Sequence, residues 1–183
     1  DRVAVTVPGY PPYRHILTAL GCEPVLIETS SDTRHALTGE ALLAAHRKAP
    51  LKGVLVGSPA NPTGTMMSRE ALTGLIHAAE SAGIRFISDE IYHGLVYAGR
   101  ASSILEFTPE AVVINGFSKL FAMTGWRLGY AILPEWLVRP VQKLQQNLFI
   151  SAADFPQFAG LAALERAVED RSVASLSGVV HHD

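Results

Sequence analysis

The stretch NGFSKLFAMTGWRLGY, Asn115 to Tyr130, decides how the rest of the chain is organised. Its lysine, Lys119, has apolar residues on both sides and no acidic residue nearer than Glu110 or Glu135. A lysine in apolar surroundings loses hydration of its charged form, which favours the neutral amine that a Schiff-base lysine requires. Taken alone, Lys119 is better explained as a solvated side chain, because lysine is almost never fully buried. Its role therefore depends on the residues that the fold brings near it.

The spacing around this stretch predicts one antiparallel strand. Val112 to Asn115 and Leu128 to Leu133 both have strand composition, and the connection Gly116 to Trp126 has only eleven residues. A parallel crossover needs about a dozen residues or more and usually a helix. We therefore expect the second strand to return antiparallel. Arg127, whose guanidinium suits an anionic oxygen group, then lies at the same sheet edge as Lys119.

Elsewhere, short β-branched runs alternate with helical patterns, which predicts a mostly parallel sheet covered on both faces. The predicted strands are Val3 to Val7, Pro24 to Glu28, Gly53 to Ser58, Ile84 to Asp89, Val112 to Asn115 and Leu128 to Leu133. The predicted helices run from Tyr13 to a stop at Gly21, from Thr38 to Lys48, from an N-cap at Ser68 to a stop at Gly83, from Pro134 to Leu148 and from an N-cap at Asp154 to Asp170. We expect an α/β fold with three layers, α/β/α.

Composition excludes several classes of protein. The chain has 183 residues, 48% hydrophobic and 17% charged, which fits one soluble domain. A net charge of -2 and scattered Lys and Arg indicate neither a nucleic-acid nor a membrane surface. The single cysteine, Cys22, excludes an internal disulfide and fits a cytoplasmic location, and we expect its side chain to pack. We expect no metal site, because the chain has no second cysteine and the sequence indicates no ligand partners for His181 and His182. The abrupt start in a strand suggests a segment of a longer polypeptide.

Polar and aromatic groups follow the carboxyl ends of the predicted strands, where open α/β sheets bind ligands. They are Tyr10, Asn61, Asp89, Tyr92, Lys119 and Arg127. An amine that forms imines, a carboxylate that keeps a heteroaromatic nitrogen protonated and an arginine for phosphate match the needs of pyridoxal 5'-phosphate. Each also has a simpler explanation: Asn61 could form a turn, Asp89 cap a helix and Tyr92 pack. Their shared edge favours the cofactor site.

Four motifs, in order PGYPPY, SPANPTG, SDEIYHGLVY and GFSKLFAMTGWRLGY, resemble those of the class I and II aminotransferases, the aspartate-aminotransferase-like enzymes of fold type I. The resemblance runs from Asp1 to about Glu169. It implies that residues 1–170 form the cofactor-binding large domain, incomplete at both ends, and it leaves 171–183 as a tail without a structural prediction. The implied upstream phosphate loop and the arginine for the substrate α-carboxylate lie outside the chain.

The resemblance also implies roles for individual residues. Lys119 matches the lysine that forms the Schiff base and moves the substrate proton, and Asp89 matches the carboxylate that pairs with the pyridinium nitrogen. Tyr92, the third catalytic candidate, and Asn61 match the groups that hydrogen-bond the phenolic oxygen of the ring.

Three further residues are implied to bind the cofactor. Arg127 matches the arginine that grips the phosphate, and Tyr10 matches the aromatic residue that stacks on the ring. Many members have a serine three residues before the lysine, where this chain has Gly116. Ser118 is therefore a weaker candidate for the phosphate than Arg127.

The implied activity is transfer of an amino group between an amino acid and a 2-oxo acid by a homodimeric parent, whereas the chain alone is expected to be inactive. Two alternatives stay open: a pyridoxal-phosphate-dependent carbon-sulfur β-lyase, and the aminotransferase-like effector domain of a transcription regulator. A nicotinamide-binding domain is excluded, because no G-x-G-x-x-G follows the first strand. His93, Trp126 and Met123 are expected to pack.

Overall fold

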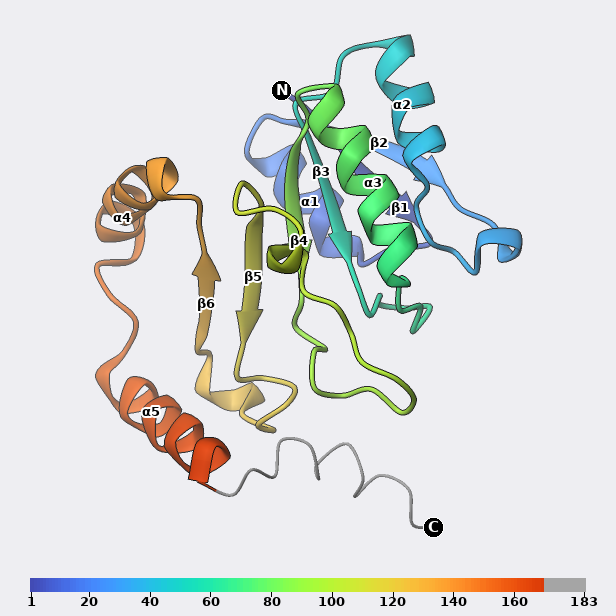
Figure 1. Ribbon diagram of the computed structural model, residues 1–183. Coiled ribbons are helices and arrows are strands. Elements are labelled where there is room, and N and C mark those ends of the chain that lie inside the picture. The colour runs from blue at the N-terminus through green and yellow to red at the C-terminus, as the bar shows by residue number, and fades with distance from the viewer. Residues whose placement is uncertain (170–183) are drawn as a thin grey trace.

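Six strands form one central sheet, in the order β2-β1-β3-β4-β5-β6 (Figure 1). The computed structural model describes residues 1–169, so the predicted tail, with His181 and His182, lies outside the described residues. The strands are β1 Arg2–Val7, β2 Glu23–Glu28, β3 Gly53–Gly57, β4 Arg85–Asp89, β5 Val112–Gly116 and β6 Gly129–Ile132. All six predicted strands are confirmed, each within two residues at either end.

The predicted reversal at the end of the sheet is also confirmed. Strands β1 to β5 pair in parallel, whereas β6 pairs with β5 antiparallel. Gly116 lies opposite Gly129 in this pair. A Cβ atom at Gly116 would lie only 3.0 Å from the carbonyl oxygen of Leu128 and 3.1 Å from the Cα of Gly129, so a serine at this position would crowd the adjoining strand.

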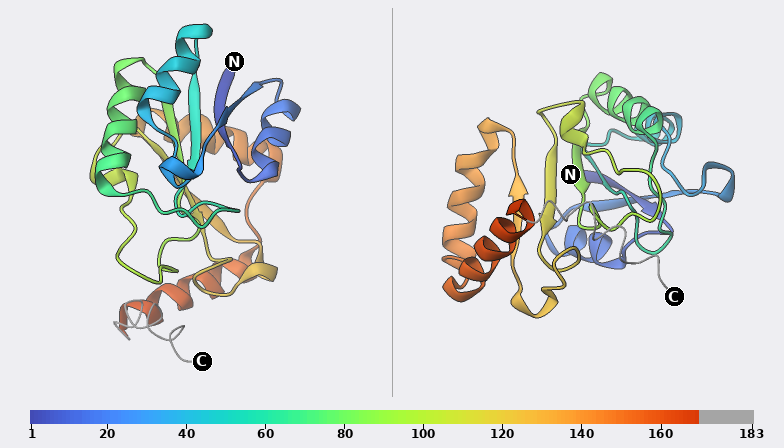
Figure 2. Two further views of the ribbon diagram at one scale, coloured as in Figure 1. Left: turned by 90° about the vertical axis from the view of Figure 1, so that its right-hand side faces the viewer. Right: turned by 60° about the horizontal axis from the view of Figure 1, so that its bottom comes forward.

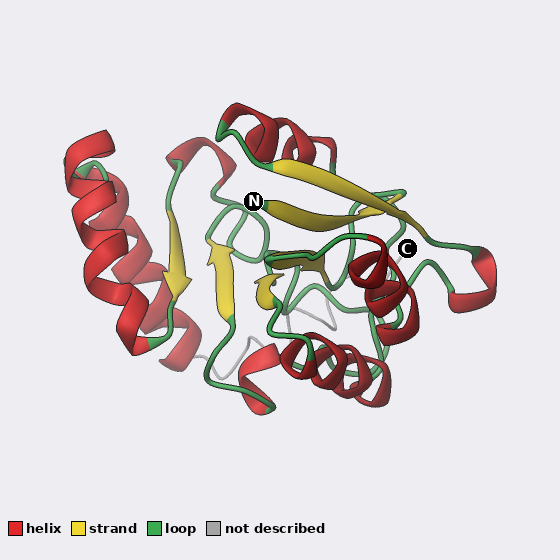
Figure 3. Cartoon of the chain, turned by 90° about the horizontal axis from the view of Figure 1, so that it is seen from above, coloured by secondary structure: helices red, strands yellow, loops and turns green. Residues whose placement is uncertain are grey.

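Helices cover both faces of the sheet, as Figure 3 shows from above. The helices are α1 Pro11–Ala19, α2 Gly39–Lys48, α3 Arg69–Ser81, α4 Glu135–Phe149 and α5 Asp154–Glu169, with 3-10 turns at Ser31–Thr33, Ile104–Glu106 and Thr124–Trp126. Thr38 and Ser68 cap α2 and α3, because each side-chain oxygen accepts a hydrogen bond from a first-turn amide at 3.2 Å. Asp154 is the first helical residue, rather than the cap that we expected.

Alternate residues of β1 face different layers, as a pleated strand requires. Ala4 is buried in the core shared with α2 and α3, whereas Val3 and Val5 pack with Leu17 of α1 on the other face. Cys22 packs against this second cluster, which confirms its expected role. The predicted α/β/α arrangement is therefore confirmed.

The last elements, β6, α4 and α5, lie at the end of the sheet opposite β2 (Figure 2). Met123 is buried, as expected, and Trp126 stacks on Phe155 of α5 with ring centroids 5.3 Å apart. No helix among residues 1–169 combines the length and apolar character that crossing a membrane requires.

Candidate functional site

A cavity of about 350 Å³ opens where β1, β3, β4 and β5 end. Every predicted site residue lines it, together with Tyr13, Pro59, Ile91 and Thr124; the predicted ones are Tyr10, Asn61, Asp89, Tyr92, Ser118, Lys119 and Arg127. Parallel strands carry their following residues to one edge of the sheet, which is why positions more than a hundred residues apart meet here. The structure thus brings all seven residues together.

Asp89, at the end of β4, is fixed by two hydrogen bonds. Its Oδ1 accepts from the backbone amide of Ile91 at 3.1 Å, and its Oδ2 accepts from the Tyr13 hydroxyl at 2.5 Å. Burial raises the pKa of Tyr13 above its usual range, and the Asp89 hydrogen bond raises it further. Tyr13 therefore remains a protonated donor, and both carboxylate oxygens of Asp89 are held by hydrogen bonds where Asp89 lines the cavity.

Tyr13 is the functional residue that the sequence reasoning missed. The sequence predicts Tyr13 only as the start of the first helix. Its ring packs edge-on against Tyr10, with centroids 5.3 Å apart, so both aromatic residues of PGYPPY enter the site. Their spacing of three residues at a helix start, just beyond a strand end, is the signal that could have identified Tyr13.

Lys119 lies in a different environment from the expected one. Its apolar neighbours Phe117 and Met123 are buried, but Lys119 itself is exposed. The apolar surroundings predicted for it are therefore wrong for this chain, because Phe117 turns away to pack beside Gly160 of α5. The amine lies over the Tyr92 ring, with Nζ 5.8 Å from the centroid, and Lys119 lines the cavity.

Arg127 reaches the same edge because the chain turns back there. Its backbone is left-handed, with φ of 53°, directly after the 3-10 turn Thr124–Trp126. The guanidinium donates to the Thr124 carbonyl at 2.9 Å through Nη1 and is otherwise exposed. Ser118 lines the cavity between Lys119 and the β5 end. The Ser118 hydroxyl and the Arg127 guanidinium thus line the same cavity as the Lys119 amine, and donors of this kind suit an anion.

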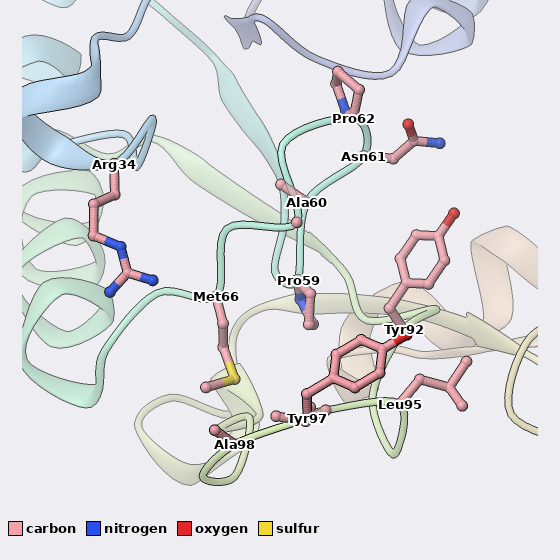
Figure 4. A pocket seen from close by; sticks show the side chains of 12 residues that line it. Arg34, Pro59, Ala60, Asn61, Pro62, Met66, Tyr92, Leu95, Tyr97 and Ala98 are labelled. Atoms are coloured by element: carbon pink, nitrogen blue, oxygen red, sulfur yellow. The ribbon is translucent and has the colours of Figure 1, made fainter. Parts of the chain in front are cut away.

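Asn61 and Tyr92 line this cavity and also border a second cavity of about 640 Å³ (Figure 4). Arg34, Met66 and Tyr97 line that neighbouring space. His93, expected to pack, is instead hydrogen-bonded: its Nε2 lies 2.9 Å from the Ser58 carbonyl oxygen. Within residues 1–169, no group of three or more His, Cys, Asp and Glu side chains gathers in a way that could hold a metal ion.

Comparison with known proteins agrees with this geometry. The profile of the family described as "Aminotransferase class I and II" matches residues 1–176. The chain belongs to this family. This aminotransferase-family chain is 47% identical, over 165 residues, to a valine-pyruvate aminotransferase from Mycobacterium tuberculosis, a match covering 89% of the chain and 42% of that relative.

Solved structures give the same result. An aminotransferase from Mycobacterium tuberculosis superposes with a TM-score of 0.87 at 44% identity, covering 97% of this chain and 45% of that one. A mutant of the aspartate aminotransferase from Thermus thermophilus superposes with a TM-score of 0.90 at 31% identity, covering 97% and 49%. The fold is therefore that of the fold-type I aminotransferases, and the chain spans less than half the length of the relatives that it matches.

Proposed function

We propose that the full-length protein is a pyridoxal-phosphate-dependent aminotransferase, which moves an amino group between an amino acid and a 2-oxo acid. The observation that supports this most strongly is the single cavity that holds Lys119, Asp89 and Arg127 together. An amine, a fixed carboxylate and a phosphate-binding guanidinium are the three protein groups that this cofactor needs.

The residues present fit the cofactor. Asp89 is held in place by Tyr13 and the Ile91 amide, so a carboxylate stands ready at the cavity floor to pair with a protonated ring nitrogen. Arg127 and Ser118 would hold the phosphate at the opposite end. When bound, the cofactor supplies an electron sink for the electron pair left on the substrate Cα after deprotonation.

The other roles in the reaction would belong to the protein's own side chains. Lys119 would attach the cofactor covalently and then, once displaced by substrate, carry the proton away from the substrate Cα. Asn61 and Tyr92 would donate hydrogen bonds to the phenolic oxygen, and Tyr10 would stack on the ring and fix its plane. Asp89 would keep a proton on the ring nitrogen.

The relatives' names support the reaction more than any one substrate, because one is named for valine and pyruvate and another for aspartate. We further propose a homodimeric, cytoplasmic parent. The 183-residue chain alone should be inactive, since the implied phosphate loop and α-carboxylate arginine are not among its residues.

The decisive experiment is borohydride reduction of the full-length protein after incubation with pyridoxal 5'-phosphate, followed by peptide mapping. The pyridoxyl mass should appear on Lys119 and disappear in Lys119→Ala. Lys143→Ala, on the exposed face of α4, is the matched control and should keep the label. A label on another lysine, or on none, would refute the assignment.

Product analysis separates transamination from the lyase alternative. An aminotransferase yields one 2-oxo acid for each amino acid formed from the added acceptor. A carbon-sulfur lyase instead releases ammonia and a thiol, with no need for an acceptor.

A further inference from the structure

Directly behind the site lies a buried carboxylate, Glu90, which follows Asp89 in the chain. The residue is only 4% exposed. Its Oε1 accepts hydrogen bonds from the Ser88 hydroxyl at 3.1 Å, the Ser103 hydroxyl at 3.2 Å and the Ile104 amide at 2.9 Å. A buried carboxylate is tolerated only with such partners. Glu90 therefore ties the end of β4 to the far end of the loop that carries Tyr92.

The second oxygen of Glu90 faces His93. Nδ1 of His93 lies 3.3 Å from Glu90 Oε2, while Nε2 lies 2.9 Å from the carbonyl oxygen of Ser58. A carbonyl can only accept, so Nε2 must carry a proton. The imidazole therefore lies between the Ser58 carbonyl, to which Nε2 donates, and the buried Glu90 carboxylate, which lies on its Nδ1 side.

We call the contacts from Glu90 through His93 to the Ser58 carbonyl the bridge; it joins the segment that carries Asn61 to the segment that carries Tyr92. Ser58 is the first residue of SPANPTG, three positions before Asn61, and its own hydroxyl accepts from the Met67 amide at 3.0 Å to close that loop. His93 follows Tyr92 directly, and its amide donates to the Glu90 carbonyl at 2.9 Å, which fixes the turn. The imidazole is thus a rigid link from the Asn61 loop to the Tyr92 turn.

We propose that His93, held by buried Glu90, is a positioning residue that sets the place of Asn61 relative to Tyr92. It touches neither cofactor nor substrate in this assignment. Its importance for catalysis rests on the proposed function, in which both residues contact the phenolic oxygen of the ring, but the bridge itself is independent of any ligand.

Two substitutions of His93 each keep one of its two contacts and remove the other. His93→Gln places an amide near the position of Nε2 and keeps a donor for the Ser58 carbonyl. His93→Asn places an amide near Nδ1, so it keeps the Glu90 contact and loses Ser58. His77→Asn, on an exposed position of α3, is the matched control. All three variants are made in the full-length protein, and thermal unfolding checks that each is folded.

The first readout is amide hydrogen exchange of the Ser58 to Gly64 peptide in the cofactor-free protein. We expect exchange about ten-fold faster in His93→Asn, the factor for one lost hydrogen bond of this class, and near-native exchange in His93→Gln and His77→Asn. The second readout is release of pyridoxal 5'-phosphate, which should also be about ten-fold faster in His93→Asn alone.

Native exchange in His93→Asn would overturn the proposal. Equal loss in His93→Gln and His93→Asn would overturn it as well, because ring packing rather than the Ser58 contact would then be responsible. A wild-type protein that binds no cofactor would refute the proposed function, while the exchange comparison would still decide the bridge.

Discussion

Helices α3 and α4 have similar lengths and both have an apolar face, but they differ completely in burial. Helix α3 buries five residues against the sheet and α2, among them Leu75 and Ile76. Helix α4 buries none, and Leu144 and Leu148 on its apolar face are 59% and 69% exposed. Strand β6 is exposed along its whole length, whereas β1 and β3 each have three buried residues.

This difference divides the site as well. Tyr10, Tyr13, Asn61, Asp89 and Tyr92 come from the well-packed part of the sheet, and Ser118, Lys119 and Arg127 come from the β5–β6 connection. The residues that we propose for binding the ring thus come from the part of the sheet whose strands are buried. Those proposed for the phosphate and the covalent bond come from the end of the sheet at β6, which is more exposed in this chain.

The largest expected effect tests the packing difference directly. Leu75→Ala in the 183-residue chain should reduce the free energy of unfolding by about 2–5 kcal/mol, because it leaves a cavity at a fully buried position. Leu148→Ala, the same chemical change on α4, should alter it by less than about 0.5 kcal/mol. Urea unfolding measures both, and similar losses would show that the two regions do not differ as described.

A second prediction concerns the ring side of the site. Asp89→Asn in the full-length protein should keep the cofactor but lower kcat by about 10²–10³-fold, since one preorganised charge of this kind contributes about 2.7–4 kcal/mol. Single-turnover reaction with amino acid measures the loss. Asp32→Asn, in the exposed Ser31–Thr33 turn, provides the control. A near-native rate for Asp89→Asn would contradict the role assigned to Asp89.

The smallest expected effect concerns support for Asp89. Tyr13→Phe removes one hydrogen bond to a charged group, so kcat should fall about ten-fold with unchanged cofactor content. Tyr130→Phe, on exposed β6, should retain the native rate. An undiminished kcat for Tyr13→Phe would mean that the Ile91 amide suffices to hold Asp89.

The same variant has a defined pH dependence. Because the folded pKa of Tyr13 is raised, its contribution is complete below the unfolded pKa near 10 and is lost only as pH rises through the folded value. The deficit of Tyr13→Phe should therefore be constant between about pH 6 and 9, and a kcat ratio that changes over this range would contradict the assignment.

Local sequence signals predicted the sheet because each strand and each crossover length is a local property. The eleven-residue connection Gly116 to Trp126 was enough to predict the antiparallel β6. The site residues were found because parallel strands carry their carboxyl ends to one edge. Motif resemblance then supplied the roles that we propose for them.

The features that the sequence did not predict depend on which way a side chain points and on contacts between residues far apart in the chain. The apolar neighbours of Lys119 suggested burial, but adjacent residues in a turn point different ways, and only Phe117 and Met123 point inward. Tyr13 meets Asp89 across 76 positions, and His93 meets Ser58 across 35. The amphipathic pattern of α4 predicted a helix and a face, but not whether anything covers that face.

The hydrogen bond between Tyr13 and Asp89 also constrains when the site can exist during synthesis. Tyr13 leaves the ribosome long before Arg127, and at about 5–20 residues per second the interval is on the order of ten seconds. Tyr13 and Arg127, both of which line the site, are 114 positions apart, whereas residues of β1 pair with residues of β2 only 21 positions further on. Assembly of the site is therefore a later event in synthesis than the pairing of these first two strands.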